Sequence, residues 1–495
     1  MNDWILTLLV ALPLVGGVVL IFFPAGRHDL VRWYSAAIAG VTALMSVYVF
    51  FSYDHGAAGF QFAREFEWLP LLGIKFSLGV DGIAILMVLL TGLVFIAGVL
   101  SSWSTTHRPK DFFVLYLLLV AGVFGVFVTR DLFFFFFFYE LAVVPMYLLI
   151  GVWGSSSSFK TFVRTKEYGA IKLILYLVAG SVLVWVAILA VYVAADQGSF
   201  ALADLANAQY SLGFQRFFFP LFMVGFGILA GLWPFHTWSP DGHVAAPTSV
   251  SMVHAGVLMK LGAYGIIRSM EILPQGAMDW MPVLIGLGTV NVVYGAISAM
   301  AQRDLKYVIG YSSVSHMGYV LMGIATLDPM GVGGAVLQMF SHGIMTALFF
   351  ALVGVIYDRA HIRDIDDLGG LAKRMGVTTV FFTVAGLASL GLPGFSGFVA
   401  ELLVFIGAFR TYPVMAVFGI FGAAITAVYI LRLLSKVFFG PISEKWQRLP
   451  DATRLESVTT GSLALVLIVV GVYPTYFIKV INSGVLPFIE LIKAT

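Results

Sequence analysis

The chain contains no cysteine, and charged residues make up only 11% of its 495 residues. Without cysteine there can be no disulfide, no thiolate-held iron–sulfur cluster and no cysteine-ligated zinc. A soluble globular protein carries about 25% charged residues, so this scarcity of charge excludes that class. The net charge of +2 is too small to indicate nucleic-acid binding. Any redox centre that serves this protein is therefore expected on another chain.

Apolar residues dominate instead: 60% of the sequence is hydrophobic, and the mean hydropathy is +0.97. Runs of about 20 apolar residues, long enough to cross a bilayer as a helix, recur along the whole chain. The sequence therefore predicts an all-α polytopic membrane protein with about fourteen transmembrane helices. The predicted spans are 4–23, 31–51, 82–102, 112–129, 131–153, 168–194, 217–235, 248–272, 280–300, 306–326, 333–357, 377–408, 412–437 and 457–482.

Lysine and arginine are concentrated in alternate loops, which indicates that these loops share one side of the membrane. The basic loops carry Arg27, Arg32, Arg108, Lys110, Lys160, Arg164, Lys166, Arg303, Lys306, Arg359, Arg363, Lys373, Arg374, Lys445, Arg448 and Arg454. The other side carries Arg64, Lys75, Arg216, Arg268 and Arg410. An even number of spans then places both termini away from the cytoplasm, matrix or stroma. Run 4–23 lacks a small-residue cleavage pattern, so it is predicted to be a retained helix and not a signal peptide.

Glycine and proline interrupt two of the predicted spans. The first break is at 232–236 in span seven, and the second is at 391–397 in span twelve. The breaks lie five spans apart, an odd number, so spans four to eight and nine to thirteen would run in opposite directions. Paired breaks in two inverted repeats indicate a transport site. The predicted units are N-terminal helices at 1–111, inverted five-helix repeats at 112–272 and 280–437, and a C-terminal helix at 438–495.

The first break is the centre of the transport hypothesis. Pro234 removes a backbone donor and interrupts the helix. We expect a short polar loop at 236–247 before the chain re-enters the bilayer and carries Lys260 to mid-depth. A broken membrane helix is tolerated only where protein or water satisfies its backbone. An ammonium group near the bilayer centre costs on the order of 3 kcal/mol. A chain that keeps both features is expected to move a charged species.

Ionisable residues inside the predicted spans are the candidate proton carriers. They are Glu140, Lys172, His254, Lys260, His316, His342 and Glu401. Such residues are costly in a membrane, so each is a functional candidate by default. A histidine can receive a proton on one ring nitrogen and release one from the other. We interpret the set as a lateral row of proton relay stations.

Several of these residues have a structural alternative. Lys172 lies within about two turns of a charged loop and can extend its ammonium to the surface. His316 and His342 can each bond a backbone carbonyl of a neighbouring helix. Glu140 and Glu401 can serve as partners of a buried cation.

Lys260 has no route to the surface, which favours function over packing. His236, His243 and His254 resemble a scattered set of metal ligands. Their spacing across the break is unspecific, so no metal site is predicted.

Five segments together resemble a known family. They are FFFFFFYELAVVPMYLLIG, LWPFHTWSPDGHVAAP, AGVLMKLGAYGIIR, RDLKYVIGYSSVSHMGYV and GLPGFSGFVAEL. The chain resembles the antiporter-like membrane subunits of respiratory complex I, and the M-type (subunit 4) chain more than the L- or N-type. The resemblance is strongest over 110–440, although each segment alone also occurs in Mrp-type antiporter and membrane-hydrogenase subunits. The chain ends soon after its last predicted span, without the long lateral helix of the L-type chain.

This resemblance implies two proton half-channels, one in each inverted repeat, joined by a central charged axis and driven by quinone reduction elsewhere in the complex. Glu140 matches the family's glutamate of span five, and Lys172 matches its lysine of span six. Lys260 matches the central lysine of span eight, and Glu401 matches the terminal acidic residue. His316 and His342 match the histidines that lie between these two. No cofactor is expected in this chain, and flavin, iron–sulfur clusters and quinone are expected in partner subunits. The implied partners are the L-, N- and K-type membrane chains, in a bacterial inner membrane or, alternatively, an organellar one.

One position departs from the family pattern. The family has a lysine in span seven, five residues before Pro234, that pairs with the glutamate of span five. Leu229 occupies this position, and its apolar side chain cannot pair with Glu140. We hypothesise that His254 or Lys172 takes over the pairing.

Three functions remain open at this stage. The leading one is a proton-translocating subunit of an NADH:quinone oxidoreductase-type complex, an enzyme subunit without a redox centre of its own. The second is a cation/proton antiporter subunit of the Mrp type. The third is a structural spacer of the membrane arm with an impaired first half-channel. The co-purifying subunits and any dependence on Na⁺ would discriminate among them.

Overall fold

Helices form nearly the whole of the computed structural model, which describes residues 4–494 except 25, 58 and 159–162. Within these residues, thirteen helices are long and apolar enough to cross a membrane. The unbroken helices are α1 (Ile5–Ile21), α2 (His28–Ser52), α3 (Ala84–Ser101), α4 (Pro109–Val128), α5 (Leu132–Trp153), α6 (Lys166–Ala195), α12 (Pro274–Ala301), α13 (Leu305–Ala325), α14 (Pro329–Ala360) and α17 (Pro413–Phe438). The fold class predicted from the sequence, an all-α multi-pass membrane protein, is confirmed.

The remaining spans are broken into pieces. They are α8 (Leu212–Ala230) with η3 (Phe235–Thr237) and α9 (Trp238–Ala245); α10 (Thr248–Val253), η4 (His254–Leu258) and α11 (Met259–Ile272); α15 (Gly376–Ser389) with α16 (Ser396–Thr411); and α18 (Arg454–Val472) with α19 (Thr475–Ala494). The predicted polar loop at 236–247 is therefore wrong, because most of it is helical. The ten unbroken helices and four broken sets of the described chain make fourteen segments. The thirteen membrane-length helices differ from this number because α1 and α15–α16 are too short to be counted, whereas α18 and α19 are counted separately.

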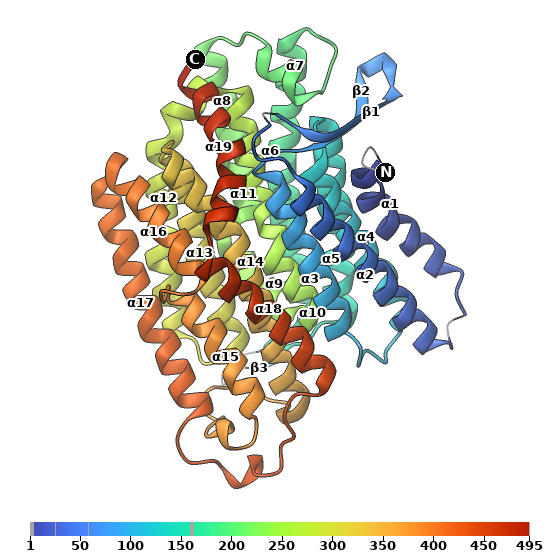
Figure 1. Ribbon diagram of the computed structural model, residues 1–495, viewed down its shortest axis with the longest axis vertical. Coiled ribbons are helices and arrows are strands. Elements are labelled where there is room, and N and C mark those ends of the chain that lie inside the picture. Colours follow the sequence, from blue (N-terminus) through green and yellow to red (C-terminus); the bar gives the residue numbers. More distant parts are fainter. Residues whose placement is uncertain (1–3, 25, 58, 159–162, 495) are drawn as a thin grey trace.

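The last predicted span, 457–482, is wrong as a single helix. Pro474 has no N–H to donate, and it forces Tyr473 out of helical geometry, at φ −125° and ψ 65°. The helix therefore ends and restarts as α19, which continues to Ala494. In Figure 1 the two pieces follow one another along the height of the bundle.

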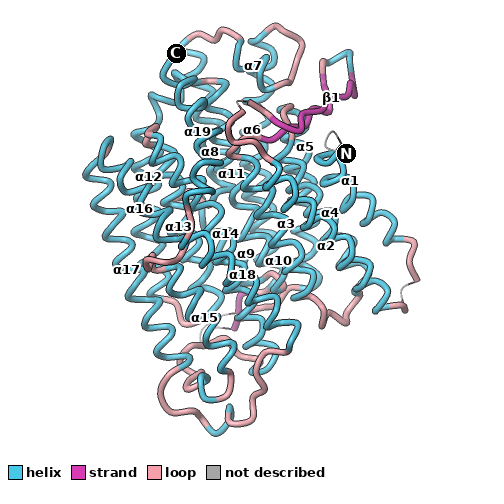
Figure 2. Tube along the Cα trace, in the orientation of Figure 1, coloured by secondary structure: helices cyan, strands magenta, loops and turns pink. Residues whose placement is uncertain are grey.

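Extramembrane structure is small and lies at the two ends of the bundle. At one end are a hairpin, β1 (Gln61–Leu69) and β2 (Ile74–Val80), and helix α7 (Leu202–Asn207). Near the other end lies the short pair β3 (Ser157–Ser158) and β4 (Val163–Arg164), and Figure 2 shows how little strand there is beside helix. Short 3₁₀ turns lie in loops at Pro70–Leu72, Leu371–Lys373 and Glu444–Trp446.

Both termini lie toward the hairpin end, opposite the end that holds the long loop before α18 (Figure 1). This agrees with an even number of spans and with basic loops gathered at one end. Lys160, one of the predicted basic loop residues, lies outside the described residues.

Helices α5 and α13 begin in the same way, each at the leucine of an Arg-Asp-Leu sequence whose aspartate is the N-cap. Asp131 accepts hydrogen bonds from two backbone amides of α5, and Asp304 does so at α13. The backbone around each aspartate also pairs with the loop that follows the next long helix. These bonds are Leu132 N to Phe200 O (2.8 Å), Leu202 N to Arg130 O (2.9 Å), Leu305 N to Arg363 O (2.9 Å) and Ile365 N to Arg303 O (2.8 Å). The two halves thus share a local structure that sequence identity alone does not reveal.

The two helices point in opposite directions. The segment after the end of α5 reaches the start of α13, because Ser156 and Asp304 line the same cavity. Arg363, which pairs beside Asp304, also donates to the Ser157 hydroxyl at 2.8 Å. The end of α5 therefore meets the beginning of α13, as inverted repeats require. The predicted unit boundaries, 112–272 and 280–437, stay a prediction.

Both breaks use one backbone motif. Gly231 and Gly391 end α8 and α15 with positive φ values of 78° and 70°, which glycine adopts without the steric cost of a Cβ. The following leucine amide then bonds back across the last helical turn, as in a Schellman cap. These bonds are Leu232 N to Gly227 O (2.8 Å) and Leu392 N to Leu387 O (3.0 Å).

Asn291 of α12 satisfies the backbone that the first break leaves open. Its carbonyl oxygen accepts from Trp233 N at 2.5 Å, and its amide donates to Gly231 O at 2.8 Å. The side chain is fully buried, so no bulk solvent can replace these bonds. This meets the requirement that protein satisfies a broken helix inside a membrane.

We expect Asn291→Leu to lower the stability of the chain by about 2–4 kcal/mol, since it strands a buried donor and a buried acceptor at once. The measurement is thermal unfolding of the purified protein in nanodiscs. Asn482→Leu, a change of the same shape on the outer helix α19, is the control and should shift the midpoint little. Equal shifts for the two variants would contradict the assignment.

Candidate functional site

Four of the seven candidate carriers lie in one continuous file. Lys260 Nζ is 2.8 Å from His342 Nδ1, and the rings of His342 and His316 stack with centroids 5.4 Å apart. His316 Nδ1 is then 3.5 Å from Glu401 Oε1. None of the four side chains is more than about 5% exposed. The file crosses from α11 through α14 and α13 to α16, so it joins the two halves of the chain.

A π-helical turn positions Lys260. In a regular α-helix the amide of Met259 would bond to the Ala255 carbonyl, but here it donates to His254, five residues back. The Ala255 carbonyl instead accepts the Lys260 ammonium at 2.5 Å. Single π turns inside α-helices occur often at functional sites, and this one was not predicted from the sequence.

Two glycines let the π turn approach α14. A Cβ on Gly343 would lie 2.6 Å from the Gly256 carbonyl oxygen, and one on Gly256 would lie 3.0 Å from that of Gly343. Since real Cβ atoms essentially never come closer than 3.0 Å, the two backbones can touch only without side chains here. The contact brings His342, the residue before Gly343, within reach of Lys260.

His316 has partners on both ring nitrogens. Nε2 lies 3.1 Å from Ser389 Oγ, and Nδ1 lies 3.1 Å from the Gln338 amide nitrogen as well as near Glu401. With Nδ1 accepting from Gln338, the ring is neutral and Nε2 donates to Ser389. With a proton on Nδ1, the ring donates to Glu401 instead. The arrangement can therefore pass a proton between the ring and the carboxyl group.

Glu401 lies against the second break. A Cβ on Gly391 would lie 2.8 Å from Glu401 Oε2. The glycine therefore both shapes the break and leaves room for the carboxyl group. Oε1 has no hydrogen-bond partner among the described residues. The file thus ends on the Glu401 carboxyl group, whose Oε1 can accept a further hydrogen bond and which lies beside the non-helical backbone of the second break.

The other three candidate carriers lie apart from this file. Lys172 donates to Asp241 Oδ2 at 2.8 Å, and His254 Nδ1 is bonded to His243 Nδ1 at 3.0 Å. Glu140 is half-buried on α5, and within the described chain its Oε1 has no partner. Within the described chain neither Lys172 nor His254 forms a hydrogen bond or ion pair with Glu140, so the hypothesis that one of them replaces the missing lysine stays a prediction.

Asp241 is a site residue that the sequence interpretation did not select. It is 5% exposed on α9 and accepts from three side chains on three other elements. They are Arg164 of β4 (2.5 Å), Lys172 of α6 (2.8 Å) and Tyr307 of α13 (2.9 Å). A single carboxylate in an apolar stretch of sequence indicates a candidate functional residue. Asp241 was missed because 236–247 was interpreted as a polar loop, in which an aspartate is expected to be exposed to water.

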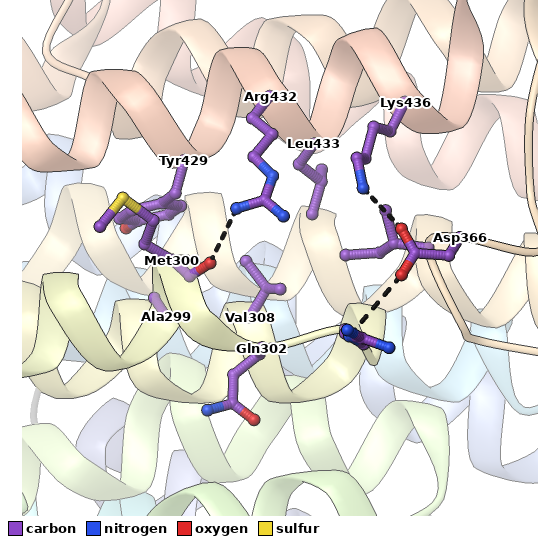
Figure 3. Close-up of a pocket in the computed structure, with 11 residues that line it drawn as sticks. Ala299, Met300, Gln302, Val308, Asp366, Tyr429, Arg432, Leu433 and Lys436 are labelled. Atoms are coloured by element: carbon purple, nitrogen blue, oxygen red, sulfur yellow. Dashed lines mark hydrogen bonds and ion pairs between the residues drawn. The ribbon is translucent and has the colours of Figure 1, made fainter.

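No group of three or more His, Asp and Glu side chains within residues 4–494, the undescribed positions aside, is arranged to hold a metal ion. A shallow surface pocket lies between α12, α13 and α17 (Figure 3). It carries ion pairs from Asp366 to Lys436 (2.5 Å) and Arg303 (3.7 Å). These partners are 41–66% exposed, so the pairs contribute little and the pocket is not a candidate site.

Known proteins share the sequence and the fold of this chain. Residues 129–426 match the family described as NADH:quinone oxidoreductase/Mrp antiporter, transmembrane. A relative from Acaryochloris marina, named NAD(P)H-quinone oxidoreductase chain 4, is 38% identical over 99% of this chain and 93% of its own. A chain of respiratory complex I from Thermus thermophilus has a TM-score of 0.90 and 26% identity, over 98% of this chain and 99% of that one.

A chain of the Mrp complex from a Dietzia species has a TM-score of 0.85 over 99% of both chains. Its identity is 21%, so this likeness shows a shared fold alone. The family match covers more than half of the chain and contains the whole file from Lys260 to Glu401. The chain belongs to the NADH:quinone oxidoreductase/Mrp antiporter transmembrane family, as a multi-pass integral membrane protein with a complex I-type fold.

Proposed function

We propose that this chain is a proton-translocating membrane subunit of an NADH:quinone oxidoreductase-type complex. The observation that carries the proposal is the buried file from Lys260 through His342 and His316 to Glu401. Each member can gain or lose a proton, and each is close enough to its neighbour for transfer with small side-chain movements. Burying such a file inside a membrane protein is unfavourable, since each ionisable group costs several kcal/mol of free energy.

Lys260 is the central station in this proposal, and Glu401 is the terminal one. Lys172, His254 and Glu140 remain proposed stations of the first half of the chain, at 112–272, with the second half at 280–437. The relatives' name, NAD(P)H-quinone oxidoreductase chain 4, supports the redox-driven assignment over a cation antiporter. The third alternative, a structural spacer, leaves the uninterrupted file unexplained.

The proposed partners are other membrane subunits of the complex, of the L-, N- and K-types, and the proposed membrane is a bacterial inner membrane. The chain is then one subunit of an enzyme whose flavin, iron–sulfur clusters and quinone belong to its partners. Proton movement in this chain is coupled to their redox chemistry through conformational change.

The decisive experiment is Glu401→Gln in the assembled complex, reconstituted in liposomes. Gln keeps the shape and one acceptor but cannot carry a proton, so the ratio of protons moved to quinone reduced is expected to fall at least several-fold. The electron-transfer rate and the vesicle pH gradient are measured together. Glu490→Gln, at an exposed position of α19, is the matched control.

An unchanged ratio for Glu401→Gln would contradict the proposal and favour the spacer. A gradient that requires Na⁺ and survives inhibition of quinone reduction would favour the antiporter.

A further inference from the structure

A cavity of about 240 Å³ lies at the hairpin end of the bundle, away from the file. One wall of it is apolar and comes from α7 and from the last turns of α19, near the end that holds both termini (Figure 1). The residues of this wall are Leu202, Ala203, Ala206, Pro487, Phe488 and Leu491. The cavity therefore lies where membrane helices end, which is the depth of the lipid headgroups.

The opposite wall holds a buried group of charges centred on Arg268 of α11. The guanidinium donates from Nη1 to Glu271 Oε1 and from Nη2 to Asp81 Oδ2, both at 2.6 Å. Asp81 Oδ1 accepts from the backbone amides of Ile83 and Ala84. Two carboxylates against one guanidinium give this group one excess negative charge. Its open acceptor is Glu271 Oε2, to which no group of the described chain donates a hydrogen bond.

Arg130, between α4 and α5, is the second cation of the cavity. Its backbone is fixed, because its amide donates to Ser77 O at 2.8 Å. Gly79 makes room for the side chain, since a Cβ there would lie 2.6 Å from Arg130 Cδ. The guanidinium lies 5.0 Å from the centre of the Phe60 ring, and that of Arg268 lies 5.3 Å from the same ring. Within the described chain, the Arg130 guanidinium has this aromatic contact but no hydrogen bond or ion pair.

The second half of the chain shows which partner Arg130 lacks. Arg303 stands before α13 as Arg130 stands before α5, and it forms an ion pair with Asp366 at 3.7 Å. Asp366 belongs to the loop whose backbone pairs with the start of α13. In the matching segment of the first half, Asp204 instead accepts from Ser199 at 2.6 Å. Arg130 is thus a half-buried cation without the counter-ion that its counterpart has, and burying a charge unpaired is unfavourable.

We propose that this cavity binds the headgroup of a zwitterionic phospholipid, with the phosphate on Arg130 and the ammonium on Glu271. The planar fork of an arginine matches the geometry of a phosphate, and an ammonium donates to a carboxylate oxygen. One cation without a counter-ion and one excess negative charge balance a zwitterion. Free phosphate or an anionic lipid would leave the charge at Glu271 uncompensated.

The apolar wall indicates that the ligand is a lipid and not a soluble phosphate ester. Pro487, Phe488 and Leu491 continue from the cavity onto the outer face of α19, where Leu486 and Leu491 are exposed. Acyl chains can lie along this face while the headgroup enters the cavity. The site is separate from the file, so the proposal goes beyond proton translocation.

The test uses the assembled complex in detergent micelles and a phosphatidylethanolamine that carries a photoreactive diazirine beside its glycerol. Labelling of the wild-type subunit is expected in peptides that contain 202–206 or 487–491. Glutamine at either polar contact removes a charge and keeps much of the side-chain length, so Arg130→Gln and Glu271→Gln are each expected to lower this labelling several-fold. Arg410→Gln, which removes an exposed arginine at the end of α16, is the matched control and should leave it unchanged.

Competition experiments on the wild-type complex decide the proposal even if the variants do not assemble. Glycerophosphoethanolamine, the soluble headgroup, is expected to reduce the labelling, whereas inorganic phosphate is not. A phosphatidylglycerol probe with the same diazirine lacks the ammonium and is expected to label several-fold less. Equal labelling by the two probes, or equal competition by inorganic phosphate, would overturn the zwitterionic site. Absence of wild-type labelling at both segments, as when a neighbouring subunit covers the cavity, would overturn it as well.

Discussion

Replacing Lys260 by methionine is expected to reduce proton translocation by the complex at least tenfold while leaving the subunit folded. Methionine has nearly the length of lysine and packs well in irregular cores, so the fully buried site should stay filled. What is lost is the ammonium bonded to His342 and to the carbonyl of Ala255. Without it the file has no member on α11, and its link to the first half of the chain is cut.

The measurement is the proton-to-quinone ratio in liposomes, with assembly checked by native electrophoresis. Lys436→Met, on an exposed ion pair at the end of α17, controls for the loss of a positive charge. Lys260→Arg distinguishes a relay from a structural cation. Arginine keeps the charge but does not release its proton, so a relay fails with arginine as well. Normal translocation by Lys260→Arg would mean that only the charge matters.

Much of the fold could be predicted from the sequence because the membrane restricts how long each spanning helix is and where it can be interrupted. A helix must be about 20 apolar residues long, and helix breaks need glycine or proline, so both spans and breaks are visible in the sequence. Lys260, His316, His342 and Glu401 stood out because charge is rare in such segments. Their order along the file needed the structure, since they come from four helices.

The errors have local causes. Residues 236–247 look like a loop because they contain Asp, His, Ser and two prolines, yet α9 forms because Asp241 finds buried partners on neighbouring elements. The π turn at His254 has no sequence signature, because it arises from the packing of Gly256 on Gly343. Pro474 was a visible break signal, but the apolar run on both sides of it favoured one helix.

The first half of the chain shows why matching its residues to the family pattern does not by itself predict which side chains pair. Leu229 is 1% exposed and packed in the core, so no cation replaces the family lysine there. The candidates for its role, Lys172 and His254, are each bound elsewhere by a residue nearby in space but not in sequence. Pair partners depend on tertiary contacts that a single sequence does not contain.

Asp241→Asn is expected to destabilise the subunit by about 3 kcal/mol, since removing one member of a buried ionic group leaves its partners uncompensated. The figure is at the low end of the range for buried pairs because Arg164 is 35% exposed and Lys172 is 18% exposed. Asparagine keeps the shape, so the loss reports charge. The readout is the thermal unfolding midpoint in nanodiscs together with the yield of assembled complex.

The same cluster predicts a specific rescue. Because Asp241 balances two cations, the double variant Asp241→Asn/Lys172→Gln should be more stable than Asp241→Asn alone, which additive effects do not allow. Asp279→Asn, which breaks an exposed pair with Arg216 at 2.6 Å, is the control and should cost less than 1 kcal/mol. Strict additivity in this cycle would contradict the energetic coupling that the 2.8 Å ion pair between Lys172 and Asp241 predicts.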